Sequence, residues 1–390
     1  MLKNRYFSGL TRNTFLLAFT SFFADISTEM LYPILPIFLT SVLFAPASII
    51  GVVEGVAEAT QNIVQGFSGY FADKIQNKKT VALFGYGLAA LAKPFIGLST
   101  FWQQVVLGRG IDRFGTGTRS APRDALIAAS VDEKNKGKAF GIEGVGDNLG
   151  AVIGPLFAVF LLYRLDVSLR SIFYLAFVPG LAAFIMILFV VETKVLKTDK
   201  IKLDFSRLPK KYWKYLLAIA IFGLGNSSNA FLILRAKNIG IPIETAILIY
   251  AGFNLAAALA SFPAGSLSDK FGRRNILVLS LVIFTIVYLG FAYSKSFLVI
   301  GLLFVFYGTY QGIFRAVGKA MAVDFIPQEL RASGIGLYSS AIGLSSLVAS
   351  IVGGQLWVRI NPAATFIYGA IFAFLGGILL FLMTSNRLSN

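Results

Sequence analysis

Long hydrophobic runs alternate with short polar segments along the whole chain. Most runs are about 20 residues or longer, the length that a helix needs to cross ~30 Å of hydrocarbon. The pattern predicts an all-α membrane protein with twelve spans. They lie at 13–39, 47–72, 80–98, 102–129, 138–162, 171–191, 214–236, 244–268, 276–293, 297–324, 332–358 and 363–384. The first run is too long for a secretory signal and lacks a small-residue cleavage site, so it is predicted to be the first span.

The longest polar gap separates the sixth span from the seventh. It reads KVLKTDKIKLDFSRLPKKYWK and predicts a cytoplasmic linker, 192–213, between domains 1–191 and 214–390. Each domain holds six spans, and the two resemble each other: GYFADK at Gly69 returns as GSLSDK at Gly265, and LIAASVDEKNKGKAFG aligns with MAVDFIPQELRASGIG 195 residues later. Such repeats are common in secondary transporters, whose site lies between the halves near the bilayer midplane.

Composition supports the membrane assignment and narrows the chemistry. Hydrophobic residues make up 56% of the chain and charged residues only 14%, against about 25% charged residues in soluble domains. There is no Cys and no His, which excludes disulfides, thiolate or imidazole metal sites, and histidine proton relays. Any proton must therefore be carried on Asp or Glu, and we expect no metal and no cofactor.

The basic excess, 35 Lys and Arg against 19 Asp and Glu, could indicate nucleic acid. Most of these residues, however, fall on one side of the predicted spans. That asymmetry follows the positive-inside rule and predicts both termini in the cytoplasm. We expect an integral protein of a bacterial inner membrane, a monomer whose surroundings are lipid and which binds no nucleic acid.

One stretch of the fourth span is densely charged. It reads GRGIDRFGTGTRSAPRDALIAAS, from Gly108 to Ser130, and holds four Arg and two Asp. At 100° per residue these charges fall within an arc of roughly 140°. A charge at bilayer depth costs several kcal/mol unless it is paired or hydrated, so this face is predicted to look onto protein or water.

Acids of spans one, two and five lie at depths that match these arginines. Depth is measured at ~1.5 Å per residue from the centre of each span. The matches are Arg113 with Glu29 and Glu58, Arg109 with Glu54, Arg119 with Asp147, and Arg123 with Glu143.

Two interpretations of these charges remain open. Structural ion pairs suit Arg109, Arg123 and Glu143, which lie toward the span ends, because buried charges persist best when paired. Groups near the middle are expected to act in transport, since the acids outnumber the arginines and a desolvated carboxylate without a full partner can take up a proton. The predicted proton-coupling residues are Asp25, Glu29 and Glu58.

The second half offers basic groups without acids beside them. Arg315 and Lys319 share a face of span ten, and either bind an anion or reach across to acids of the first half as a gate; Lys319 could also snorkel to the cytoplasm. Tyr32 lies beside prolines expected to bend span one, and faces either the cavity or the lipid interface. The predicted substrate-binding residues are Arg113, Arg119, Asn226, Asn229, Gln311, Arg315, Lys319 and Tyr32.

Several motifs resemble those of the major facilitator superfamily. GSLSDKFGRR matches the loop signature G-x-x-x-D-[RK]-x-G-[RK]-[RK], and GYFADKIQNKK is a copy in which Gln76 and Asn77 depart from it. RGIDRFG resembles the fourth-span signature R-x-x-Q-G-x-G, with Asp112 and Arg113 in place of Gln and Gly. GAVIGP resembles the start of the fifth-span pattern associated with antiporters, without its trailing Gly-Gly.

The resemblance implies two six-helix bundles around a central cavity, the fold of that family. It also implies that charged loop residues clamp the inward gate, although positive charge that only sets topology explains them too. The predicted gating residues are Asp73, Lys74, Asp124, Asp269, Lys270, Arg273 and Arg274.

Together these features predict a secondary active transporter that works by alternating access. We expect proton coupling and a small organic anion, a polycarboxylate or a siderophore-like acid, as substrate. The alternative is a proton antiporter that exports cationic drugs or metal ions. Nothing indicates ATP use, because no phosphate-binding loop motif occurs. An enzyme is disfavoured because no nucleophile–base set stands out, and a sensor because the linker is too short for a signalling domain.

Overall fold

The computed structural model describes residues 9–75, 77–132, 135–192, 208–327 and 330–383. Helices account for nearly all of this part of the chain, and no strand occurs in it. The twelve predicted spans are all present, most of them within three residues of the predicted bounds. Most of the predicted linker, 192–213, lies outside the described residues.

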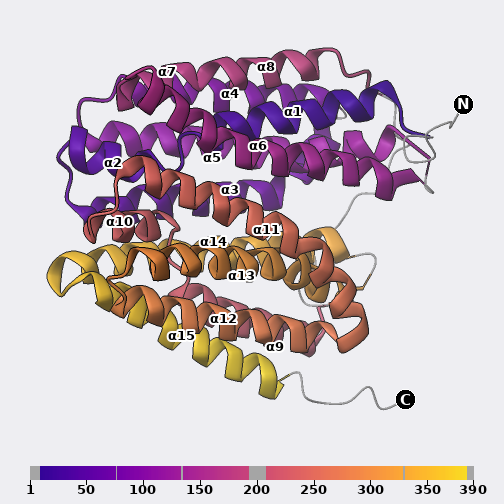
Figure 1. Cartoon of the computed structure of the whole chain (residues 1–390). Helices are drawn as coiled ribbons and strands as arrows, with labels where there is room; N and C mark the ends of the chain where they lie inside the picture. The colour runs from indigo at the N-terminus through magenta and orange to yellow at the C-terminus, as the bar shows by residue number, and fades with distance from the viewer. Residues whose placement is uncertain (1–8, 76, 133–134, 193–207, 328–329, 384–390) are drawn as a thin grey trace, which may run out of the picture.

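The helices form two bundles, drawn from indigo to magenta and from salmon to yellow in Figure 1. The N-terminal bundle contains α1 (Arg12–Glu29), α2 (Leu35–Ile37), the π-helix η1 (Phe38–Val42), α3 (Ala47–Ile75), α4 (Lys78–Gly97), α5 (Trp102–Ala129), α6 (Lys136–Arg164), α7 (Leu169–Leu175) and α8 (Phe177–Leu188). The C-terminal bundle contains α9 (Lys210–Gly225), α10 (Ala230–Asn238), α11 (Ile243–Phe271), α12 (Arg273–Tyr293), α13 (Phe297–Asp324), α14 (Arg331–Arg359) and α15 (Pro362–Met383).

The bundles meet along two helix pairs. α3 packs along α14, and α6 packs along α11. We call the end where α1 begins and α15 ends the proximal end, and the end where η1 leads into α3 the distal end (Figure 1). At the distal end α10 also contacts α2 and α3, so the two bundles touch closely there.

Two of the spans are broken near their distal thirds. α1 ends at Glu29, and the chain turns through Pro33 before α2 begins, because proline removes a helical hydrogen bond and clashes with the preceding turn. Span seven was predicted as one helix at 214–236, with Asn226 and Asn229 one turn apart. That prediction was wrong: α9 ends at Gly225 and α10 starts at Ala230, so the two asparagines lie in the break. Broken helices are tolerated at membrane depth where protein or water satisfies the freed backbone groups.

Glycine sets two local features that matter for the site. Gly272 has φ +88° and joins α11 to α12, a left-handed conformation that other residues rarely adopt. On α6, Gly146, Gly150 and Gly154 face α1 so closely that a Cβ on Gly150 would stand 2.5 Å from the carbonyl oxygen of Phe22. This close approach brings the acids of α6 against those of α1.

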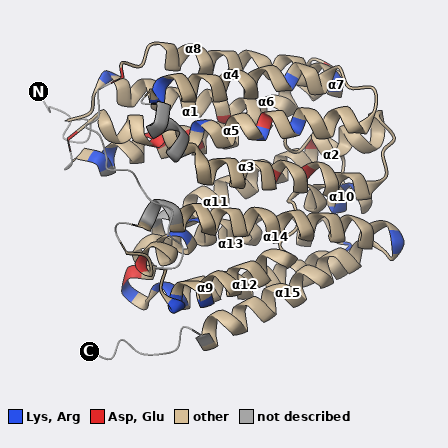
Figure 2. Ribbon diagram, turned by 180° about the vertical axis from the view of Figure 1, so that it is seen from behind, with Lys and Arg blue, Asp and Glu red and all other residues tan. Residues whose placement is uncertain are grey.

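The described residues include nine helices that are long and apolar enough to cross a membrane, with α7 and α8, and α9 and α10, each taken together. The spans of α1, α3 and α5, which carry more charged side chains, are not among the nine. Figure 2 shows these charges, in red and blue, along the middle of the N-terminal bundle, whereas the C-terminal bundle is largely tan between its ends. The polar chemistry at membrane depth is therefore concentrated in one bundle.

Candidate functional site

The middle of the interface between the bundles is organised around Glu29, the last residue of α1. Its Oε2 accepts hydrogen bonds from the Tyr250 hydroxyl (2.9 Å) and from Asn254 Nδ2 (3.2 Å), both on α11. Arg113 and Arg315, which come from opposite bundles, both interact with it electrostatically. One carboxylate of the N-terminal bundle is thus held by groups of both bundles.

Two more side chains of the N-terminal bundle cross the interface beside Glu29. The Ser346 hydroxyl of α14 donates to the carboxylate of Glu58 on α3. Tyr32 shares a 3.1 Å hydrogen bond with Ser228 in the break between α9 and α10. Its ring stacks on Tyr250 with centroids 5.5 Å apart. Tyr32 therefore faces the interface, the first of its two predicted environments.

The arginines predicted near mid-depth have different environments. Arg113 Nη1 donates to Gln61 Oε1 (3.1 Å), and Arg113 Nε lies 3.8 Å from Asp112 Oδ2. Depth matching predicts Arg119 near Asp147. The structure instead places the Arg119 guanidinium 4.1 Å from the centre of the Tyr86 ring, inside the N-terminal bundle. Arg119 is buried there, away from the interface residues just described.

The predicted binding residues of the C-terminal bundle gather on α13 and at the break in span seven. Gln311, with its amide oxygen toward the guanidinium, accepts from Arg315 Nε (3.2 Å) and Nη2. Asn229 accepts a hydrogen bond from the Tyr307 hydroxyl (2.8 Å). Arg315 and Lys319 are exposed. Arg315 reaches the Glu29 region, whereas Lys319 lies one turn nearer the proximal end.

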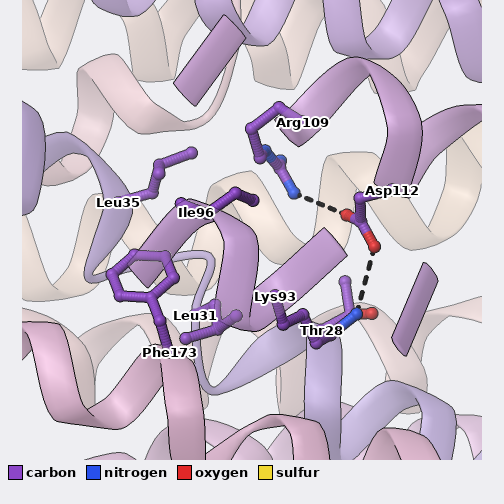
Figure 3. A pocket seen from close by; sticks show the side chains of 8 residues that line it. All are labelled: Thr28, Leu31, Leu35, Lys93, Ile96, Arg109, Asp112 and Phe173. Carbon is purple, nitrogen blue, oxygen red and sulfur yellow. Dashed lines mark hydrogen bonds and ion pairs between the residues drawn. The ribbon is translucent and has the colours of Figure 1, made fainter. Parts of the chain in front are cut away.

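A second cluster is fully buried inside the N-terminal bundle. Arg109 donates to Glu54 Oε1 from Nη2 (2.7 Å) and Nε (3.0 Å), and its Nη1 lies 3.0 Å from Asp112 Oδ2. Lys93 Nζ lies 3.0 Å from the other oxygen of Asp112. Figure 3 shows Lys93 and Arg109 reaching Asp112 from two helices. The Arg109–Glu54 match is confirmed. Lys93 was missed, although a lysine inside an apolar span is itself a signal.

A third cluster lies closer to the proximal end. Arg123 Nη1 is 3.0 Å from Glu143 Oε1 and 4.0 Å from Asp147 Oδ1, and its Nη2 is 3.0 Å from Asp124. The Arg123–Glu143 match is therefore confirmed. Asp25 and Asp147 interact with each other, since the glycines of α6 let α1 approach.

The predicted gating residues of the C-terminal bundle contact other residues of that bundle. Arg273 Nη1 pairs with Asp324 (2.9 Å), and its Nη2 lies 3.7 Å from Asp269. Arg274 lies over the ring of Phe381, and Lys270 over that of Phe271. The side chains of Asp73 and Lys74 lie outside the described residues.

This arrangement places two acids, Glu29 and Glu58, in contact with groups of both bundles. In the described part of the chain, no group of three or more acidic side chains is placed to hold a metal ion. The charged groups at the interface carry opposite signs: Glu29 and Glu58 are acidic, and Arg113 and Arg315 are basic. Such a site can exchange an internal counter-charge for a charged substrate.

Known proteins resemble this chain over nearly its full length. The model of the Major Facilitator Superfamily matches residues 17–234 and 215–389. An MFS-type transporter of Methanocaldococcus jannaschii is 38% identical over 95% of this chain and 94% of its own. The quinolone resistance protein NorA of Staphylococcus aureus is 24% identical over 97% of this chain and 98% of its own.

Solved structures agree with the fold. A bacterial homolog of the human lysosomal transporter Spinster, in an inward-facing and occupied conformation, has a TM-score of 0.78 at 14% identity, covering 97% of each chain. The nucleoside transporter NupG has a TM-score of 0.76 at 15% identity, covering 97% of this chain and 100% of its own. The match of the family model along the chain and the 38% identical relative establish that this protein is a transporter of the Major Facilitator Superfamily.

Proposed function

We propose that this transporter moves a small organic anion together with protons, through a site between the bundles centred on Glu29. The observation that carries the proposal is the position of that carboxylate. It is bonded to Tyr250 and Asn254 across the interface and interacts with two arginines, one from each bundle. A polycarboxylate or a siderophore-like acid is the substrate class that two guanidinium groups favour.

The coupling follows from charge competition. When Glu29 is ionised, it is the counter-charge that Arg113 and Arg315 share. When Glu29 takes up a proton, both guanidinium groups lose that partner and can bind the carboxylates of a substrate. Proton and anion therefore bind in the same state of the protein. Glu58, held by Ser346, is in a position to do the same on the neighbouring side of the interface.

Transport requires the two bundles to rock against each other, so that the site opens to each side in turn. In this conformation Tyr32, Glu29 and Glu58 tie the bundles together in the middle and toward the distal end. Opening the distal end breaks those contacts. We assign the moving bodies to domains 1–191 and 214–390 and the termini to the cytoplasm. The proposal also takes the protein to act as a monomer in a cytoplasmic membrane.

Export of cationic drugs is a second candidate function. Its support is the full-length similarity to a quinolone resistance protein and the pairing of acids with stacked aromatic rings, Tyr32 on Tyr250, beside Glu29. In that case the cation binds the ionised carboxylates, and a proton replaces it. The two candidates differ in whether Arg315 or Glu29 holds the substrate.

A substrate screen in proteoliposomes with an imposed pH gradient tests the proposal. The panel contains di- and tricarboxylates, hydroxamate siderophores and fluorescent cationic dyes. We expect Glu29→Gln to abolish uphill accumulation of the anion while exchange across equal pH persists, because the mutant site is fixed in its neutral form. Glu244→Gln, at the first turn of α11, is the matched control and should transport normally.

Arg315→Gln separates the two candidates. It should abolish anion transport if the guanidinium holds the substrate, and it should spare transport of a cationic dye. An anion still concentrated by Glu29→Gln contradicts the coupling role of that residue. An anion transported normally by Arg315→Gln contradicts the proposed substrate class.

A further inference from the structure

The acids at the interface between the bundles are held by partners that carry no charge. Glu29 accepts hydrogen bonds from a hydroxyl and from an amide, those of Tyr250 and Asn254. The partner of Glu58 is the hydroxyl of Ser346. A neutral donor fixes the position of a carboxylate but does not cancel its charge, so both acids keep their charge for other groups.

The two arginines of this site are held in the same way, each by a glutamine. Arg113 Nη1 donates to the side-chain oxygen of Gln61 on α3 (3.1 Å). Arg315 donates from Nε (3.2 Å) and from Nη2 to the side-chain oxygen of Gln311, one turn earlier on α13. A guanidinium group keeps its proton in proteins, and an amide oxygen is neutral. Each glutamine therefore fixes the direction of a cation and leaves its full charge.

One acid lies near Arg113, but closer cations already share it. Asp112 Oδ2 is 3.8 Å from Arg113 Nε. The same carboxylate forms ion pairs of 3.0 Å with Lys93 and with Arg109. Since two cations divide its single charge at shorter range, Asp112 compensates only a small part of the charge of Arg113. Arg315 is exposed and has no ion pair within 4 Å among the described residues.

Four arginines away from the interface show the contrast, because their charge is compensated where they lie. Arg109 and Arg123 pair with acids at 2.7 and 3.0 Å. Arg170 donates to backbone carbonyl groups at the end of α4, and Arg235 to those at the end of α12 as well as to Asn238. The end of a helix carries roughly half a negative charge on such carbonyl groups. The two interface arginines have neither kind of compensation from their glutamines.

We propose that Gln61 and Gln311 set the charge selectivity of the substrate site. Each amide oxygen orients one guanidinium group without neutralising it, so that two positive charges remain for the carboxylates of a dianionic substrate. A carboxylate in place of either amide would occupy its arginine permanently. The glutamines are positioning residues that act through Arg113 and Arg315. Their role rests on the proposed function, which brings both arginines to one site at Glu29.

The same hydrogen bonds select which edge of each guanidinium group meets the substrate. A guanidinium group has five N–H donors in a fixed plane. Gln311 takes the edge formed by Nε and Nη2 of Arg315, which leaves the edge formed by Nη1 and Nη2. Gln61 takes Nη1 of Arg113, which leaves Nη2. Two parallel N–H groups suit one carboxylate, so Arg315 is expected to bind a carboxylate with two hydrogen bonds and Arg113 to bind the other.

Substitutions of nearly equal size separate selectivity from a structural role. Gln61→Glu and Gln311→Glu keep the bond to the arginine and add a negative charge. Gln61→Met and Gln311→Met remove the bond and add no charge. If the glutamines only hold the arginines, the glutamate variants hold them more firmly and bind anions normally, and the methionine variants lose the most affinity. We expect the reverse order, because a bonded carboxylate competes with the substrate.

Binding of citrate, succinate and acetate to the purified full-length protein in detergent tests this order, by isothermal titration and by the shift in melting temperature. The Kd for citrate should rise at least about tenfold in each glutamate variant, ~1.4 kcal/mol, and about two- to fivefold in each methionine variant. Acetate, with one carboxylate, should bind more weakly than citrate or succinate. Without ligand, the glutamate variants should melt no lower than the wild type. Gln103→Glu, exposed in the first turn of α5, is the matched control and should bind citrate normally.

Gln311→Glu decides the test if Gln61→Glu is unstable, because Arg315 is exposed and the new carboxylate beside it stays in water. Citrate bound by a folded Gln311→Glu variant as tightly as by the wild type overturns the proposal, whatever is transported. Wild-type protein that binds neither citrate nor succinate overturns it together with the proposed substrate class. Conversely, an anion still concentrated by Glu29→Gln refutes the proposed coupling, and loss of citrate binding in Gln311→Glu then still supports the role of the glutamines.

Discussion

The two bundles place different chemistry at the same position of the repeat. α5 and α13 both have 28 residues and start 195 residues apart, and α4 and α12 start at the same offset. By that offset the buried pair Lys93–Asp112 corresponds to Tyr288–Tyr307. The first pair is joined by a 3.0 Å ion pair, and the second by rings stacked with centroids 6.0 Å apart. One bundle has charges where the other has aromatic rings.

Aromatic rings are the simpler way to fill the core of a helix bundle. Phe284 illustrates it: its ring lies 3.9 Å from that of Tyr288, 4.9 Å from that of Tyr310 and 5.1 Å from that of Phe222, measured between centroids. Such pairs add about 0.5–1.5 kcal/mol each beyond the burial of their area. No charge has to be removed from water.

The charged cluster of the N-terminal bundle is stable only while every partner is present. Desolvating a charge costs several kcal/mol, and the mutual attraction of Glu54, Arg109, Asp112 and Lys93 offsets that cost. Since rings of similar volume serve at the equivalent position, the fold does not require charges there. The comparison therefore indicates that the charges of the N-terminal bundle have a role other than filling its core.

The largest expected effect follows from breaking the ionic cluster at its centre. Asp112→Asn keeps the shape but leaves Lys93 and Arg109 facing each other without the shared carboxylate. We expect a loss of about 3–5 kcal/mol in the free energy of unfolding, measured by denaturant titration in detergent micelles. A variant as stable as the wild type would show that water or another acid already balances these cations.

Replacing the ionic pair with an apolar pair sharpens the comparison. The double variant Lys93→Met, Asp112→Leu removes both charges, as at the equivalent C-terminal position, and should recover most of that loss, to within ~2 kcal/mol of the wild type. A double variant no more stable than Asp112→Asn would show that the charges, and not only their loss of a partner, matter for the fold.

The smallest expected effect concerns the aromatic side of the comparison. Tyr307→Phe removes the hydroxyl that donates to Asn229 but keeps the ring stack. We expect a loss of about 1 kcal/mol, the net value of one hydrogen bond. Tyr293→Phe, at an exposed end of α12, is the control and should be neutral. A loss as large as that of Asp112→Asn would mean that the rings alone do not stabilise this bundle.

The twelve spans could be predicted because each is a long apolar run, and the bend near Pro33 because proline disrupts helices. Depth along a helix also predicted Arg109 with Glu54 and Arg123 with Glu143, since both partners of each pair lie on neighbouring helices. The break at Asn226 carries no proline and gave no such signal.

Arg119 shows the limit of depth matching, which fixes the height of a side chain but not its direction around the helix axis. Arg119 lies over the ring of Tyr86 because α5 packs on α4 there, and no ion pair between Arg119 and Asp147 is found in the described part of the chain. Lys93 was missed for a related reason: a lone lysine in an apolar span predicts a buried partner without indicating which acid it reaches. Packing between helices, which fixes these directions, is a long-range property of the fold.

The contacts between Tyr32 and Ser228, and between Ser41 and Lys237, each join residues 196 positions apart. That separation is within one residue of the repeat offset, so each contact joins residues at nearly equivalent places in the two bundles. Symmetry mates can touch only next to the axis that relates them. The pseudo-twofold axis of the molecule therefore emerges between these residues, and spectroscopic labels at positions 41 and 237 form a nearly symmetric ruler for the widening of the distal mouth.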